Sequence, residues 1–178
     1  MTASMPQTSE TGTDERDIAL VVDLDGTLSR TDTLHEALLA LISADPSHAF
    51  RLPGWLRGGR AAFKAPIADR LVVDPENLPL NEAVVETIRA AREAGRHIAL
   101  VSAADHRQVT AVAEATGLFD EAYGSAEGCN LKGEEKAAFL TQHFGPGKFD
   151  YIGDSSADLP VWTAARKAIT VQAKPALR

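Results

Sequence analysis

Short apolar runs alternate along the chain with longer segments whose apolar residues recur every three or four positions, which predicts strands alternating with helices. The strand candidates are residues 18–22, 97–101, 121–123, 149–152 and 168–171. The first of these runs is apolar throughout, as is typical of a strand buried within a parallel sheet. The alternation indicates βαβ units, so we expect an α/β fold with a mostly parallel sheet.

Between these strands the spacing of apolar residues predicts helices with recognisable ends. The helices are expected to begin after Asn81, Asp105, Gly133 and Asp158. The first carries a single apolar stripe formed by Val84, Val85, Ile88 and Ala91. Gly95 and Gly117 lie where the first two helices should end, and Pro160 is tolerated in the first turn of the last one.

Residues 31–80 interrupt this rhythm, because they are helical in pattern and contain no strand candidate. They directly follow the loop after the first strand, so we interpret them as a helical cap inserted there, where it would cover a site as a lid. The predicted organisation is therefore a disordered tail over residues 1–16, a core formed by 17–30 and 81–178, and a helical cap over 31–80.

Composition narrows the class of protein. The 178 residues carry a net charge of −7, which argues against general nucleic-acid binding. The single cysteine, Cys129, cannot form an internal disulfide. The first 16 residues lack the apolar stretch of a signal peptide, and no apolar run reaches the length of a membrane span. We therefore expect a cytoplasmic protein without a transmembrane segment.

Polar groups follow the strand candidates where a parallel sheet would bring them together. The segments are residues 23–27, 102–103, 130–134 and 153–158. Because the carboxyl ends of parallel strands meet at one crevice, these segments should converge. Asp23 and Asp25 would place two like charges there, which is costly unless a cation or a reacting group is present.

Each of these residue types has a role in phosphoryl transfer. Carboxylate and carbonyl oxygens are ligands for Mg²⁺, and a carboxylate can also attack phosphorus to form an aspartyl phosphate. A second carboxylic acid can protonate the leaving oxygen and then deprotonate the hydrolytic water. A hydroxyl, backbone N–H groups at a helix start and a lysine can hold the phosphoryl oxygens.

Together the four segments resemble the motifs of the haloacid dehalogenase (HAD) superfamily, over residues 17–171. The resemblance implies a Rossmann-like core with a helical cap like that of the phosphoserine-phosphatase-like branch. It also implies an Mg²⁺-dependent phosphatase in which Asp23 is the nucleophile and Asp25 the general acid/base. The Mg²⁺ ion would be held by Asp23, the backbone carbonyl of Asp25, and Asp154.

The same resemblance assigns the remaining site residues. The phosphoryl group would be bound by Ser102, Ala103, Lys132 and Thr27. Asp158 would not bind the metal itself but would contact the groups around the metal or Lys132. Lys136 competes for the phosphate-binding role, but Lys132 precedes a glycine and matches the family motif better. We therefore assign the role to Lys132 and expect Lys136 to be an exposed helix residue.

Residues 130–133 and 154–162 also look like those of HAD domains fused to UbiA-like membrane prenyltransferases. In those proteins a transmembrane part follows, whereas this chain ends at Arg178, so a free-standing relative and an excised domain both stay open. Residues 50–64 are basic and apolar without an acid, and a solvated helical face is the common explanation. The sharper hypothesis is a prenyl or lipid-linked phosphate substrate, or peripheral contact with an anionic membrane.

Other kinds of site fit the sequence less well. Residues 153–157 approximate a hydrolase nucleophile elbow, but no histidine follows Ser155 to complete a triad. The histidines lack the paired spacing of a zinc site. Two alternatives to hydrolysis stay open, namely phosphotransfer to an alcohol and a non-catalytic docking or regulatory role for a membrane prenyltransferase. The substrate and the oligomeric state are not determined by the sequence.

Overall fold

The computed structural model describes residues 14–31, 43, 45–47, 78–126 and 128–171. Most of the predicted cap, including the basic segment 50–64, lies outside the described residues, as do residues 1–13 of the predicted tail. The end of that tail is described, and Glu15–Asp17 form a single 3-10 turn capped by the Asp14 side chain. The cap and its substrate hypothesis therefore stay predictions, and the described structure is mainly that of the core.

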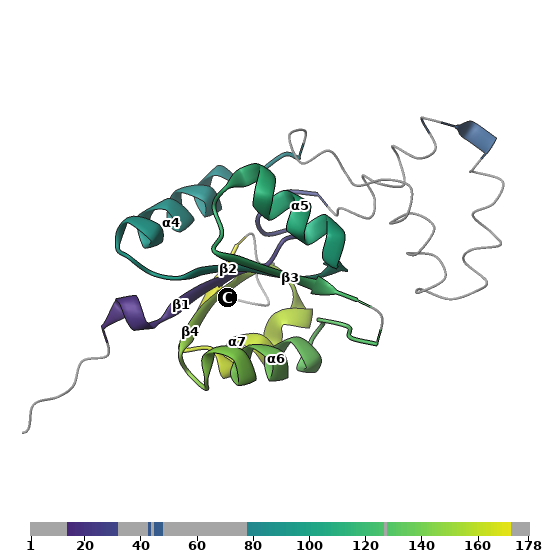
Figure 1. The fold of residues 1–178 in the computed structure, drawn as a ribbon. Helices are drawn as coiled ribbons and strands as arrows, with labels where there is room; N and C mark the ends of the chain where they lie inside the picture. Colours follow the sequence, from purple (N-terminus) through teal and green to yellow (C-terminus); the bar gives the residue numbers. More distant parts are fainter. Residues whose placement is uncertain (1–13, 32–42, 44, 48–77, 127, 172–178) are drawn as a thin grey trace, which may run out of the picture.

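Five parallel strands form one sheet in the order β3-β2-β1-β4-β5 (Figure 1). The strands are β1 (Ala19–Val22), β2 (Ile98–Asp105), β3 (Glu121–Ser125), β4 (Phe149–Gly153) and β5 (Lys167–Thr170). Each of them overlaps one of the strand candidates, so the predicted α/β fold with a parallel sheet is confirmed. The first strand in sequence is the central one in space, with β2 on one side and β4 on the other.

Helices cover both faces of this sheet, with α4 and α5 on one face and α6 and α7 on the other (Figure 1). Their bounds are Glu82–Glu93 for α4, His106–Thr116 for α5, Glu134–Phe144 for α6 and Leu159–Ala164 for α7. The predicted ends of α5 are confirmed, since the Asp105 side chain accepts a hydrogen bond from Arg107 N and Gly117 closes the helix with a φ of 60°. None of the described helices is both long and apolar enough to cross a membrane.

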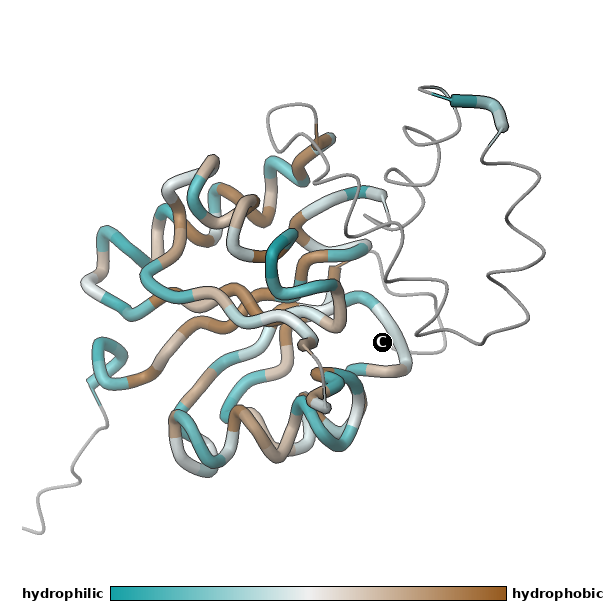
Figure 2. Tube along the Cα trace, turned by 45° about the vertical axis from the view of Figure 1, so that its right-hand side comes forward, coloured by the Kyte–Doolittle hydropathy of each residue, from teal (hydrophilic) through white to brown (hydrophobic). Residues whose placement is uncertain are grey.

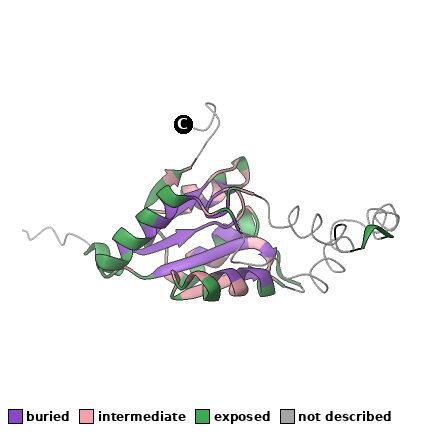
Figure 3. Cartoon of the chain, turned by 90° about the horizontal axis from the view of Figure 1, so that it is seen from above, coloured by how far each residue is buried: buried purple, intermediate pink, exposed green. Residues whose placement is uncertain are grey.

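The core consists of two apolar layers that share β1. Leu20 and Val22 pack on the α4 and α5 side, and Ala19 and Val21 pack on the α6 and α7 side. Successive side chains of a strand point to opposite faces, so a strand covered on both faces must be apolar at every position. Figure 2 shows apolar segments running through the middle of the molecule, and Figure 3 shows the strands buried there. Each fully buried aliphatic side chain contributes about 1.5–3 kcal/mol to stability.

The two ends of the predicted insertion lie side by side. Ser29 forms an antiparallel bridge with Leu80, and Asn81 N donates a hydrogen bond to Leu28 O at 2.8 Å. Arg30 N also donates a hydrogen bond to Pro79 O at 2.9 Å. The chain therefore leaves the core and returns to it next to the loop that follows β1. The predicted cap is thus attached beside the acidic loop.

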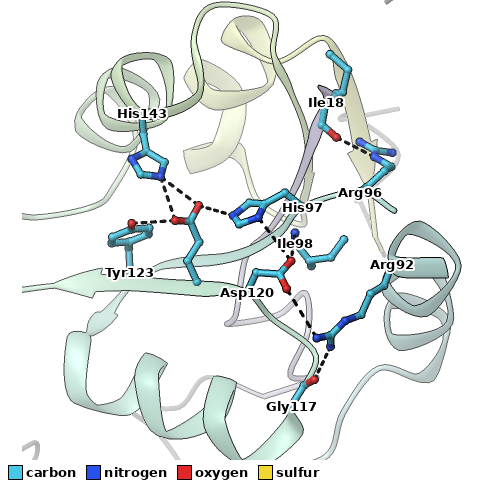
Figure 4. A network of polar contacts seen from close by, with 10 residues as sticks. Ile18, Arg92, Arg96, His97, Ile98, Gly117, Asp120, Tyr123 and His143 are labelled. Atoms are coloured by element: carbon cyan, nitrogen blue, oxygen red, sulfur yellow. Dashed lines mark hydrogen bonds and ion pairs between the residues drawn. The ribbon is translucent and has the colours of Figure 1, made fainter. Parts of the chain in front are cut away.

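A polar network closes the opposite edge of the sheet, where β2 and β3 begin (Figure 4). Glu121 contacts His97 Nε2 at 3.0 Å, His143 Nε2 at 3.1 Å and the Tyr123 hydroxyl at 3.0 Å. The neighbouring Asp120 accepts a hydrogen bond from Ile98 N at 2.8 Å. These contacts join the starts of β2 and β3, at the opposite end of the sheet from the acidic groups.

Candidate active site

The three aspartates Asp23, Asp154 and Asp158 converge at the carboxyl edge of the sheet. Each offers one carboxylate oxygen, and these oxygens lie within 4.8 Å of one another. Asp23 follows β1, and its N–H donates a hydrogen bond to Ile152 O of β4 at 3.0 Å. The segment after β4 supplies the other two carboxylates. The pairing of β1 with β4 thus brings together groups that lie far apart in the sequence.

Lys136 lies in this cluster, and Lys132 does not contact it. Lys136 Nζ donates a hydrogen bond to Asp23 Oδ1 at 2.7 Å and lies 3.7 Å from Asp158 Oδ1. Its side chain is buried, with the whole residue 3% exposed, whereas Lys132 is exposed in the loop before α6. The expectation that Lys136 is an exposed helix residue is therefore wrong.

The direction of α6 explains the difference between the two lysines. In a βαβ unit the helix runs back against the strands, so its first turn lies at the carboxyl edge of the sheet. Helical side chains also tilt toward the start of the helix, which points the Lys136 side chain to that edge. A signal was present in the sequence, because Lys136 lies four residues before Leu140 and shares its buried side.

The loop after β1 packs directly against the segment after β4. Gly26 has a φ of 76°, and a Cβ atom placed there would collide with the Asp154 carboxylate. The backbone conformation therefore favours glycine, and a larger residue would also displace the Asp154 carboxylate. Asp25, which precedes it, is half-buried and lies close enough for its charge to raise the pKa of both Asp23 and Asp154.

The predicted hydroxyl groups lie at the same edge but are buried. Ser102 is in the last part of β2, where the register with β3 shifts, and its Oγ accepts a hydrogen bond from Ala104 N at 3.0 Å. Ala103 beside it is half-buried. Thr27 is fully buried, and its Oγ1 has no hydrogen-bond partner among the described residues. Direct contact of these groups with a substrate stays a prediction.

Burial and like charge shape the electrostatics of the cluster. Burial raises the pKa of Asp23 to about 7, with contributions from Asp158 and Asp25, while Lys136 acts in the opposite direction. Burial and the nearby Asp158 also raise the pKa of Asp154. One ammonium group thus faces several carboxyl groups, and a further cation would relieve their repulsion.

The donor set of the three aspartates fits a divalent metal ion. Their converging oxygens belong to three separate carboxylates, two of them buried and that of Asp154 half-buried. Hard oxygen ligands of this kind suit Mg²⁺ or a similar ion. Asp158 takes part in the cluster itself, whereas the family resemblance had placed it outside the metal ligands.

A family of known proteins matches most of the chain. The family model described as haloacid dehalogenase-like hydrolase matches residues 20–162. A curated protein of Sinorhizobium fredii (strain NBRC 101917 / NGR234), called uncharacterized protein y4nM, is 42% identical over 158 residues. The match covers 88% of this chain but only 30% of that protein, so this chain spans less than a third of its relative.

Solved structures share the fold at low sequence identity. A protein of unknown function from Bordetella pertussis Tohama I has a TM-score of 0.69 at 22% identity, over 90% of this chain and 92% of that one. A structure titled as a phospho-aspartyl intermediate analogue of phosphoserine phosphatase has a TM-score of 0.57 at 19% identity, over 91% of this chain and 90% of the other. At these identities the likeness concerns the fold.

Proposed function

Because the chain belongs to the haloacid dehalogenase-like hydrolase family, we propose that it is a phosphatase that hydrolyses a phosphate monoester through an aspartyl phosphate on Asp23. The observation that carries this proposal is the buried contact between Asp23 and Lys136, at 2.7 Å, within a cluster of aspartates. A nucleophilic carboxylate needs a neighbouring cation to keep it ionised and to neutralise the incoming phosphoryl group. The fold likeness to phosphoserine phosphatase supports the same reaction.

The reaction proceeds in two displacements at phosphorus. In the first, an Asp23 carboxylate oxygen bonds to phosphorus while the bond to the leaving alcohol oxygen breaks, and Asp25 donates a proton to that oxygen. In the second, Asp25 removes a proton from water as the water oxygen bonds to phosphorus. The bond to Asp23 then breaks and inorganic phosphate leaves. Asp25 ends each cycle in its starting protonation state.

Lys136 takes the phosphate-binding role that the sequence resemblance gave to Lys132. Its Nζ already donates a hydrogen bond to the nucleophilic carboxylate. As the new bond to phosphorus forms, the same ammonium group can stabilise the negative charge on the phosphoryl oxygens. Ser102, at the end of the neighbouring strand β2, is the proposed second donor. Thr27 and Ala103 stay candidates for the same group.

The metal in this proposal is Mg²⁺, held by Asp23, Asp154 and Asp158, with the backbone carbonyl of Asp25 as a further candidate ligand. When bound, the ion would neutralise phosphoryl charge. The half-buried Asp154 borders the Asp25–Gly26 loop, so the same carboxylate can hold the ion and keep the loop in place.

The substrate class depends on the predicted cap, and two classes are proposed. One is a small soluble phosphate, and the other is a prenyl or lipid-linked phosphate, as the likeness to domains fused to UbiA-like prenyltransferases suggests. The basic and apolar segment 50–64 supports the second class. Leu159, next to Asp158, is 50% exposed and offers apolar surface close to the site.

An assay of phosphate release tests the proposed hydrolysis. The chain is incubated with Mg²⁺ and a panel of sugar phosphates, phosphoamino acids and prenyl phosphates, and Asp23→Asn is compared with Asp17→Asn. Asp17 is an exposed aspartate in the turn before β1, so its variant is a matched control. We expect turnover to be abolished in the first variant and kept in the second, and activity retained in Asp23→Asn would refute the nucleophile assignment.

The same assay separates the alternative functions. Added acceptor alcohols would yield new phosphate esters if the phosphoryl group on Asp23 is transferred to an alcohol in place of water. A chain that is inert toward the whole panel would instead favour a docking or regulatory role. Binding of the chain to anionic vesicles tests the proposed peripheral membrane contact.

A further inference from the structure

The buried hydroxyl of Tyr151 forms hydrogen bonds with both Lys136 and Asp158. The residue is fully buried in β4, and its hydroxyl oxygen accepts a hydrogen bond from Lys136 Nζ at 2.8 Å. The same hydroxyl donates to Asp158 Oδ1 at 2.8 Å. The directions are fixed, because an ammonium group can only donate and a phenol has one proton to give. Lys136, Tyr151 and Asp158 thus form an ordered chain of donors and acceptors.

The lysine contacts two carboxylates, one more closely than the other. Lys136 Nζ lies 2.7 Å from Asp23 Oδ1 but 3.7 Å from Asp158 Oδ1. Two buried carboxylates compete for one ammonium group, and the Tyr151 hydroxyl bridges the lysine and Asp158 at 2.8 Å from each.

The surroundings of Tyr151 are built to keep this arrangement. A Cβ atom at Gly153 would lie 2.8 Å from Tyr151 Cε1 and 2.7 Å from Asp158 Oδ2, so a larger residue there would displace these side chains. Asp158 Oδ2 is held separately by Ser155 N at 3.2 Å and Ser155 Oγ at 3.3 Å. Asp158 is therefore held by hydrogen bonds to both of its carboxylate oxygens.

We propose that Tyr151 is a positioning residue, whose hydroxyl keeps Lys136 in its short contact with the nucleophilic Asp23 and leaves only a longer ion pair with Asp158, at 3.7 Å. The inference rests on the proposed phosphatase function. Tyr151 acts through Lys136, so its loss should affect the reacting state more than substrate binding. Without the hydroxyl, the lysine moves toward Asp158, and Asp23 loses its cationic partner.

The first test compares Tyr151→Phe with Tyr123→Phe. Both changes remove a hydroxyl that is hydrogen-bonded to a carboxylate, but the Tyr123 hydroxyl binds Glu121, at 3.0 Å, outside the acidic cluster. We expect Tyr151→Phe to lower kcat on the order of 10- to 100-fold, as for a misplaced catalytic group, with little change in KM. Tyr123→Phe should leave both parameters unchanged. An unchanged kcat in folded Tyr151→Phe would overturn the proposal.

A double variant tests whether the effect passes through the lysine. In the Lys136→Met background the hydroxyl has no ammonium group to position, so adding Tyr151→Phe should lower kcat no further. If the two losses multiply, Tyr151 acts by another route and the proposed positioning role is wrong.

A spectroscopic measurement applies even where Tyr151→Phe fails to fold. The chain has two tyrosines, so 3-fluorotyrosine labelling gives two ¹⁹F resonances, which Tyr123→Phe assigns. Lys136→Met should shift the Tyr151 resonance and leave that of Tyr123 in place. An unshifted Tyr151 resonance overturns the positioning role, whatever the activity. A shifted resonance in a chain that hydrolyses no phosphate supports the arrangement and overturns the proposed function instead.

Discussion

Lys136 Nζ and Asp23 Oδ1 lie 2.7 Å apart in the interior of the protein, although the two residues are 113 positions apart in the sequence. The contact joins the end of the central strand to the first turn of α6. It gives the buried carboxylate a cationic partner in a cluster whose other members, Asp25, Asp154 and Asp158, carry carboxyl groups. The choice between the two lysines of this region is therefore the most direct test of the site.

Replacing Lys136 by Met should lower kcat about 100-fold or more, the usual loss when a group that stabilises transition-state charge is removed. Lys132→Met is the matched control, since Lys132 is exposed four residues earlier, and its kcat should stay close to that of the unchanged chain. Phosphate release with saturating substrate measures both. The opposite order of effects would return the phosphate-binding role to Lys132.

Gly26→Ala should impair both stability and activity. The left-handed backbone alone costs about 1–2 kcal/mol for a residue with a Cβ atom. At Gly26 this atom would also displace the Asp154 carboxylate, whereas at Gly117, with a φ of 60°, it would meet no atom within 4 Å. Thermal unfolding and activity assays should therefore show a stability loss alone for Gly117→Ala. Full activity in Gly26→Ala would mean that the loop does not depend on this contact.

Mg²⁺ should stabilise the folded chain. An ion that binds only the native state at about 100 times its Kd adds about 2.7 kcal/mol to the free energy of unfolding. We therefore expect Tm to rise with Mg²⁺ and to fall back when EDTA is added. Asp154→Asn should abolish most of the shift because it neutralises one of the three converging carboxylates. A shift that persists in this variant would place the ion elsewhere, and Asp17→Asn serves as the unaffected control.

Asp150 should make the free energy of unfolding decrease at acid pH. Burial raises the pKa of its carboxyl, but hydrogen bonds from Arg166 and Arg96 outweigh burial and hold the pKa below its ordinary value. A lowered pKa in the folded state means that this stabilisation is complete above the ordinary value of about 3.9 and is lost as the pH falls through the folded value. Urea unfolding at pH values above and well below about 3.9 measures this loss.

The variant Asp150→Asn should remove this part of the pH dependence. At pH 7 it should also lower the free energy of unfolding by about 3 kcal/mol, because both guanidinium groups lose their buried partner. Equal slopes of stability against pH in the two chains would show that other carboxyl groups determine the acid sensitivity.

Local pattern was sufficient for the elements of the core. The stripe of Val84, Val85, Ile88 and Ala91 is the buried face of α4. The cap at Asp105 and the left-handed Gly117 lie at the ends of α5. These features depend on neighbours within a turn or two of the chain, so the sequence alone contains them. The same holds for β1, whose continuous apolar run reflects burial on both faces of the sheet.

The site required information that is not local. The sequence resemblance favoured Lys132 over Lys136, and the start of α6 after Gly133 decides otherwise by directing the Lys136 side chain inward. Asp158 returns to the cluster because the turn Ser156–Asp158 folds its carboxylate back toward Ser155. Neither the helix start nor the turn has a fixed place relative to Asp23 until the sheet is assembled.

The sequence by itself therefore determined the strands and helices of the core and the two acids that follow the first strand. The tertiary structure decided which lysine faces Asp23, that Asp158 joins Asp23 and Asp154, and that Tyr151 lies between the lysine and Asp158. The physical reason is that secondary structure follows from periodic burial and local capping. A buried charge acquires its partner only when parallel strands bring distant segments to one edge.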